Sequence, residues 1–163
     1  MFTALELFDL AVRVEENGER FYRLALNRVK RDSVRNLLVW LADQEILHKS
    51  SFAKARERIA GENKPVPSFP SLDSDVLRNA MGRHAFSLDE LHIDSIRDEE
   101  QILRAALLFE EDTMLFFEFI SSFISDPDAL SILEKIRIEE SNHKQLILEK
   151  ILELEKKNPS NKL

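Results

Sequence analysis

A pattern of glutamate and histidine residues occurs twice in this chain, and it constrains the fold more than any other feature. Shifting the sequence against itself by 95 residues superposes the two copies without a gap. Self-similarity at a fixed offset indicates two copies of one structural unit, here a helical hairpin. The superposed pairs are Glu15 with Glu110, Glu45 with Glu140, and His48 with His143.

Each of these residues interrupts a stripe of apolar side chains at helical spacing. Around Glu15, for example, Phe8, Ala11 and Tyr22 lie on the same face of a helix. Four such stripes predict four amphipathic helices, two in each copy of the repeat. The expected helix boundaries are Asp32 or Ser33 and Gly61 for the second helix, Ser95 with Asp98 for the third, and Asp126 with Pro127 for the fourth.

The chain is long enough, at 163 residues, to form one domain with its own core. We expect a single all-α domain over residues 1–163, with one hairpin at 3–60, a crossover at 61–95 and a second hairpin at 96–157. The crossover contains Pro65, Pro67 and Pro70, which is typical of a linker. It is expected to include a short helix at 74–81 and a turn at 87–91.

The spacing within each hairpin places the polar residues at one height. The two glutamates of a hairpin are 30 residues apart. If the turns fall near Lys30 and Ser125, each glutamate is roughly 22 Å from its turn, because a helix rises 1.5 Å per residue. Each histidine follows its glutamate by three residues and shares its helix face. An antiparallel four-helix bundle would therefore bring four glutamates and two histidines together.

Four carboxylates in an apolar interior are unstable unless they are protonated or paired with cations. Two divalent cations would neutralise them, and a ligand set of oxygens and two imidazoles suits iron, with manganese or zinc as alternatives. A Glu from each of two helices and a Glu-x-x-His from each of the other two is the ligand pattern of di-metal carboxylate bundles. The predicted ligands are Glu15, Glu45, His48, Glu110, Glu140 and His143.

Other residues near these positions have alternative roles. Glu16 and Glu111 lie about 100° off the apolar stripe and are expected to face solvent. Gln44 and Glu139 could hydrogen-bond the histidine ring of the opposite hairpin. Tyr22 is on the stripe, where it is either an ordinary core aromatic, a hydrogen-bond donor to the site or a one-electron relay. His84 and His92 have no partner in the repeat and are expected to be turn or surface residues.

The segments Glu15 to Tyr22 and Leu41 to His48, with their counterparts in the second half, resemble the rubrerythrin-like branch of the ferritin-like superfamily. The resemblance covers both hairpins, about two thirds of the chain. It implies a ferritin-like bundle with a non-haem di-iron site that handles hydrogen peroxide or dioxygen, often in a homodimer. It does not assign which carboxylates bridge the metals.

The sequence departs from the rubrerythrin pattern in two ways. Rubrerythrins have a rubredoxin module, in which four cysteines hold an iron ion that supplies electrons, whereas these 163 residues contain no cysteine. Rubrerythrins also usually have a carboxylate three residues after the helix-three glutamate, where this chain has Thr113. The expected function is therefore an oxidoreductase with an external electron donor. The alternatives are a ferroxidase or iron-storage protein, and a metal-stabilised interaction module without turnover.

Composition excludes several other classes of protein. The formal net charge is −7, which is the wrong sign for binding nucleic acid. Without cysteine, thiolate metal sites and disulfides are excluded. No run of 18 apolar residues or basic leader segment is present, so we expect no membrane association and a cytoplasmic location.

Overall fold

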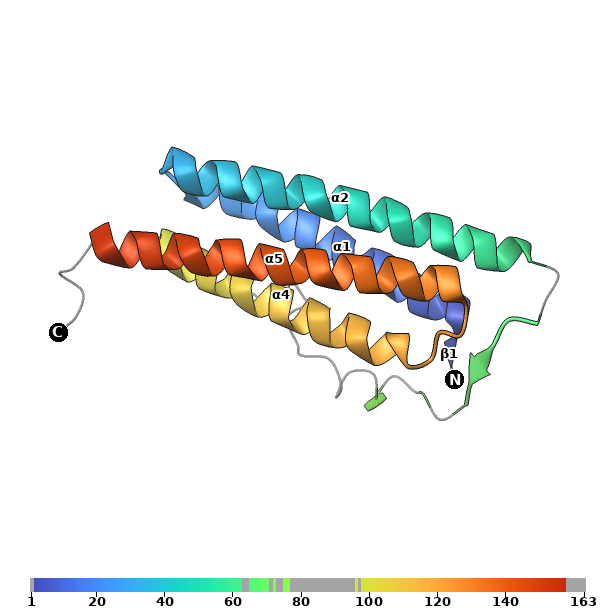
Figure 1. The fold of residues 1–163 in the computed structure, drawn as a ribbon. Helices are drawn as coiled ribbons and strands as arrows, with labels where there is room; N and C mark the ends of the chain where they lie inside the picture. The colour runs from blue at the N-terminus through green and yellow to red at the C-terminus, as the bar shows by residue number, and fades with distance from the viewer. Residues whose placement is uncertain are drawn as a thin grey trace.

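Four long helices account for most of the described residues of the computed structural model (Figure 1), which describes residues 2–62, 65–70, 72, 75–76, 96 and 98–157. This architecture confirms the predicted all-α bundle. The helices are α1 (Ala4–Ala25), α2 (Asp32–Gly61), α4 (Glu99–Ser121) and α5 (Pro127–Lys157).

The helices form two hairpins that pack side by side along their length (Figure 1). A 3₁₀ turn, η1 (Leu26–Arg28), lies in the connection from α1 to α2, and a short loop joins α4 to α5. Within each hairpin the two helices pack mainly on each other, and the hairpins meet through α2 with α5 and α1 with α4. The two turns fall where the repeat predicted them, so the hairpins align with their polar residues at one height.

Most of the helix starts have side-chain caps. Thr3 and Glu6 form a reciprocal capping box at α1, and Asp126 accepts a hydrogen bond from the Ala129 amide at 2.7 Å, as predicted for α5. The prediction for α4 was wrong by three residues, because Asp98 and not Ser95 is its N-cap, accepting from the Gln101 amide at 2.8 Å.

The start of α2 also differs from the prediction. Its N-cap is Arg31, whose side chain makes no capping hydrogen bond, and Asp32 is already helical. The turn is held instead from the other hairpin, because a Glu99 carboxylate oxygen accepts from the amides of Lys30 at 2.6 Å and Arg31 at 2.7 Å. A cap supplied by a distant segment leaves no local signal in the sequence.

Two short strands accompany the bundle. Strand β1 (Phe2–Thr3) pairs in antiparallel fashion with β2 (Ser68–Phe69), at the N-terminal end of α1. The sequence did not predict them, because two residues are too short to show an alternating pattern. The predicted helix at 74–81 (apart from residues 75–76), the turn at 87–91, His84 and His92 lie outside the described residues.

Two apolar clusters fill the bundle, one toward each end, and leave a middle layer between them. Helix α4 has a second row of apolar side chains, Phe109, Phe116 and Phe119, beside the stripe that contains Glu110. This row is largely covered within the chain: Phe109 and Phe116 are buried, and Phe123, just beyond α4, has its ring 5.2 Å from that of Phe69 in the crossover. Among the described residues, no helix has the length and apolarity required to cross a bilayer.

Candidate metal centre

The structure brings all six of the predicted ligand residues together in the middle layer of the bundle. Each of the four long helices contributes at least one of them, so the centre depends on the whole fold. Every one of these residues is at most 2% exposed. They are Glu15 on α1, Glu45 and His48 on α2, Glu110 on α4, and Glu140 and His143 on α5.

The six side chains form two overlapping groups of potential ligands, in each of which the ligand atoms lie within 4.8 Å of one another. Glu45 and Glu140 belong to both groups. We call the group with Glu15 and His48 the His48 half, and the group with Glu110 and His143 the His143 half. This arrangement fits two neighbouring cation positions, at which Glu45 and Glu140 would be common ligands.

Both imidazole rings point their Nδ1 atoms into the centre. His48 Nδ1 lies 2.8 Å from Glu140 Oε1, and His143 Nδ1 lies 2.9 Å from Glu140 Oε2. The two rings stack on each other at 5.4 Å with an interplanar angle of 13°. The Nε2 atoms therefore point outward, where the surrounding residues can contact them.

Many polar atoms in the centre are buried without a hydrogen-bond partner. They include both carboxylate oxygens of Glu15 and of Glu45, one oxygen each of Glu110 and Glu140, and Nδ1 of His48. Such atoms are rare in folded proteins, because each costs free energy when it is removed from water. Divalent cations would satisfy these oxygens and this nitrogen together, so the residues fit a di-metal site.

The pKa values of the buried groups also show that charged carboxylates are unfavourable in this centre without a cation. Burial raises the pKa of Glu15, Glu45 and Glu110, in the last two well above the usual carboxyl value. Burial would also raise the pKa of Glu140, but its hydrogen bond with His143 and its close approach to His48 outweigh the effect of burial and lower that pKa. Burial opposes the charged form of His48, yet its carboxylate neighbours raise its pKa. These raised pKa values favour proton binding at the centre when no cation balances its carboxylates.

Tyr22 takes part in the centre as a hydrogen-bond donor. Its side chain is fully buried and its hydroxyl donates to Glu110 Oε1. Burial, and then the charge of Glu110, raise the pKa of Tyr22 well above that of free tyrosine. Of the alternatives weighed for Tyr22, the contact supports the hydrogen-bond donor, whereas a role as one-electron relay stays a prediction. The repeat has Phe117 at this position.

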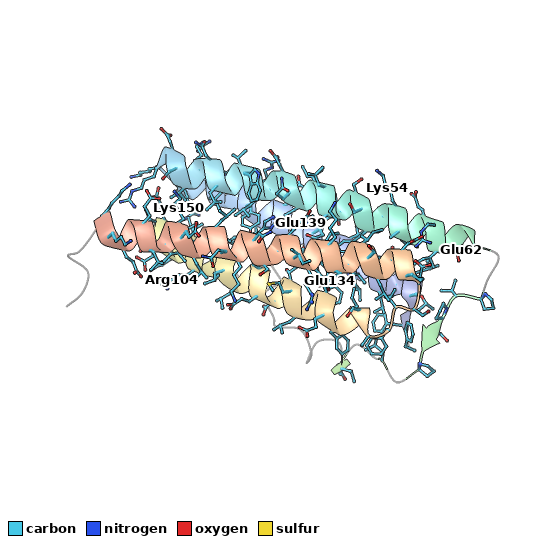
Figure 2. The ribbon with its side chains drawn as sticks, viewed as in Figure 1. Lys54, Glu62, Arg104, Glu134, Glu139 and Lys150 are labelled. Atoms are coloured by element: carbon cyan, nitrogen blue, oxygen red, sulfur yellow. The ribbon has the colours of Figure 1, made fainter. Side chains whose placement is uncertain are left out.

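The residues next to the ligands behave as predicted, with one exception. Glu139 lies at the edge of α5 that faces α2 (Figure 2) and its Oε2 lies 3.0 Å from His48 Nε2. Glu16 is exposed, and Glu111 forms an ion pair with Lys144 at 2.7 Å. The exception is Gln44, which is half-buried and makes no hydrogen bond to a histidine among the described residues.

Two residues near the centre were not identified from the sequence. The Trp40 ring meets the ring of His143 edge-on, with centroids 5.2 Å apart. Gly18 lies where a β-carbon would come within 3.1 Å of the Glu45 carboxylate carbon and 3.0 Å of Phe109. A comparison of the two repeats could have identified both positions, because the second copy has a different kind of residue at each: Lys135 in place of Trp40 and Thr113 in place of Gly18.

Replacing Gly18 by alanine tests the close approach at this position. The methyl group is expected to push Glu45 by a few tenths of an ångström and to lower the affinity for divalent cations. Stability without metal should change by less than about 1 kcal/mol, because better helix propensity offsets the contact with Phe109. Zinc titration calorimetry with urea unfolding in EDTA measures the two effects. Unchanged affinity would show that the helices accommodate the methyl group.

Comparisons with known proteins agree with this description. The family model described as Rubrerythrin matches residues 6–152. The fold is similar to that of a Thermotoga maritima protein described as a ferritin-like diiron-carboxylate protein, with TM-score 0.67 and 22% identity, covering 91% of this chain and 93% of that one. It is also similar to a hypothetical protein from Pyrococcus furiosus, with TM-score 0.66 and 18% identity, covering 92% and 89%.

A search of curated protein sequences found no match. The two solved structures are less than 25% identical to this chain, so they establish the fold alone. The family model, in contrast, extends over both hairpins and includes all six residues of the centre. This chain therefore belongs to the rubrerythrin family.

Proposed function

We propose that this protein is a di-iron oxidoreductase that reduces hydrogen peroxide or dioxygen with electrons from a separate donor. The observation that carries the proposal is the set of buried, unpartnered carboxylate oxygens around two inward-pointing imidazoles. Membership of the rubrerythrin family supports it. Oxygen-rich ligand sets with imidazole suit iron, and also manganese or zinc.

The geometry supports a specific assignment of ligands. Glu45 and Glu140, which belong to both groups of ligand atoms, would hold both ions. Glu15 and His48 would complete one position, while Glu110 and His143 would complete the other. Four protein residues would hold an ion at each position, and an iron ion that accepts further ligands would leave room for a small molecule to bind.

The chemistry of the reaction matches a pair of metal ions. When bound at such a centre, two ferrous ions would supply the two electrons that, with two protons, convert one hydrogen peroxide into two water molecules. The chain contributes an interior that excludes bulk water, with Phe117 and Phe21 in the flanking apolar clusters. Tyr22 holds Glu110 in place, and the buried Thr113 hydroxyl, which has no partner in the described structure, can hydrogen-bond a small bound molecule.

The electrons must come from another molecule if these 163 residues act alone, because they contain no cysteine to hold a rubredoxin-type iron. The centre itself is at most 2% exposed, so a large donor cannot reach it directly. A one-electron redox protein that docks on the surface of the bundle would satisfy this requirement.

Anaerobic loading with ferrous iron tests the proposal. We expect about two iron ions per chain. On mixing the loaded protein with hydrogen peroxide, one peroxide should be consumed per pair of ferrous ions, as followed by stopped-flow absorbance and a peroxide assay. Oxidation by dioxygen in a parallel experiment would identify the better oxidant. Protein that stays empty of metal would contradict the proposal.

The size of the assembly separates this function from iron storage. A homodimer is the expected state in sedimentation velocity. A large cage that continues to take up iron beyond the two bound ions would instead support the ferroxidase or storage function. Bound iron that reacts with neither oxidant would support a metal-stabilised module without turnover.

A further inference from the structure

The two halves of the centre have matching ligands but different surroundings. The repeat makes the comparison direct, because each residue of the centre has a counterpart 95 positions away. The ligands are identical in the two copies, whereas four positions close to them are not. The differing pairs are Gln44 with Glu139, Trp40 with Lys135, Gly18 with Thr113, and Tyr22 with Phe117.

In the His48 half, the imidazole is fixed by a carboxylate. Glu139 Oε2 lies 3.0 Å from the outward Nε2 of His48, and the other Glu139 oxygen lies 3.9 Å from Lys135. A hydrogen bond from Nε2–H leaves the Nδ1 lone pair directed into the centre. Carboxylate partners of this kind orient a ligand histidine and increase its basicity, which strengthens metal binding.

In the His143 half, no carboxylate of the described structure takes the corresponding position. Its counterpart of Glu139 is the neutral Gln44, and its outer contact is the edge of Trp40. Trp40 is 41% exposed, so a side chain that contacts this half also reaches the surface. Tyr22 and Thr113 are also associated with this half, because Tyr22 binds Glu110 and Thr113 lies one turn beyond Glu110 on α4.

We propose that the two halves bind metal in order, the His48 half first and the His143 half second, and that Glu139 sets this order. The inference rests on the proposed function, since it requires a di-metal centre. It assigns Glu139 as a positioning residue that acts through His48. The weaker His143 half, with the unpartnered Thr113 hydroxyl beside it, is then the side at which a small molecule binds.

A cobalt titration tests the order, because the chain contains a single tryptophan. The visible absorbance of bound Co²⁺ counts the ions, and quenching of Trp40 fluorescence reports mainly on the half that contains His143. We expect most of the quenching during the second equivalent. Anomalous scattering from crystals of protein loaded with one equivalent should locate that ion beside His48.

Two variants and one control test whether Glu139 sets the order of metal binding. Glu139→Ala should weaken the first binding step by about 10-fold to 100-fold and abolish the order. Gln44→Glu, which supplies the missing carboxylate beside His143, should bring quenching forward into the first equivalent. Glu134→Ala is the matched control on α5, because Glu134 pairs with Arg137 away from the centre, and it should leave the order unchanged.

The outcomes distinguish this inference from the function on which it rests. Quenching in proportion to absorbance from the first addition, or a first ion located beside His143, would overturn the order while leaving the di-metal site intact. An order that survives Glu139→Ala would overturn the role of Glu139. A protein that binds no cobalt, iron or zinc would overturn the proposed function and the inference together.

Discussion

Replacing both Glu45 and Glu140 by glutamine is expected to reduce the bound metal from about two ions per chain to none. These two residues belong to both groups of ligand atoms, so their loss removes negative charge and ligands from each half at once. Glutamine has nearly the same volume as glutamate, and the fold should persist. Elemental analysis after anaerobic ferrous loading measures the loss, and circular dichroism checks that the helices remain.

Two controls make this result specific. Changing Glu16 and Glu111 to glutamine removes the same number of acidic groups from outside the centre, and it should leave the stoichiometry at about two. Glu15→Gln alone removes a ligand that belongs only to the His48 half and should leave about one ion. A folded Glu45→Gln, Glu140→Gln protein that retains both ions would exclude these carboxylates as ligands.

The convergence of the six residues could be predicted from the sequence because it depends on two regular quantities. The spacing of 30 residues within a hairpin sets the height of the glutamates, and the helical repeat sets the face of each side chain. Neither depends on details of packing. The apolar stripe separated Glu15 from the exposed Glu16 beside it, because the repeat pairs Glu16 with Glu111 just as it pairs Glu15 with Glu110.

Features that depend on contacts between distant segments could not be predicted in the same way. The α1–α2 turn is held by Glu99, about 70 residues away, and the approach of Trp40 to His143 crosses from α2 to α5. Such contacts produce no periodic pattern in the sequence from which they could be predicted. Even for Gln44 and Glu139, the sequence predicted equal roles, and only the three-dimensional packing shows that one contacts a histidine and the other does not.

The stability of the metal-free protein is expected to fall as the pH rises from about 5 to about 8. Burial raises the pKa of Glu15, Glu45 and Glu110 above the unfolded value of 4.5, so the folded chain binds more protons than the unfolded chain above that pH. His48 adds to this trend above its unfolded value of 6.5, because its carboxylate neighbours also raise its pKa in the folded state.

The sign and the size of this effect follow from proton linkage. When the folded state holds more protons, the free energy of unfolding decreases with pH, by about 1.4 kcal/mol per pH unit for each additional proton held. Glu140 has the opposite shift, but its lowered pKa affects stability only below the unfolded value of 4.5. Across the measured range, the shifted groups therefore act in the same direction.

Metal should reverse the trend, because the ligands bind a cation only in their deprotonated forms. Affinity then rises with pH, and saturation with zinc at a thousand times its dissociation constant would add about 4 kcal/mol to stability. Urea unfolding in EDTA and in zinc, at matched ionic strength, gives the two curves, which should diverge as the pH increases. The Glu45→Gln, Glu110→Gln variant should flatten the metal-free curve, since two of the raised carboxyl groups are gone. Metal-free protein that gained stability between pH 5 and 8 would show that the buried glutamates are charged and balanced without metal.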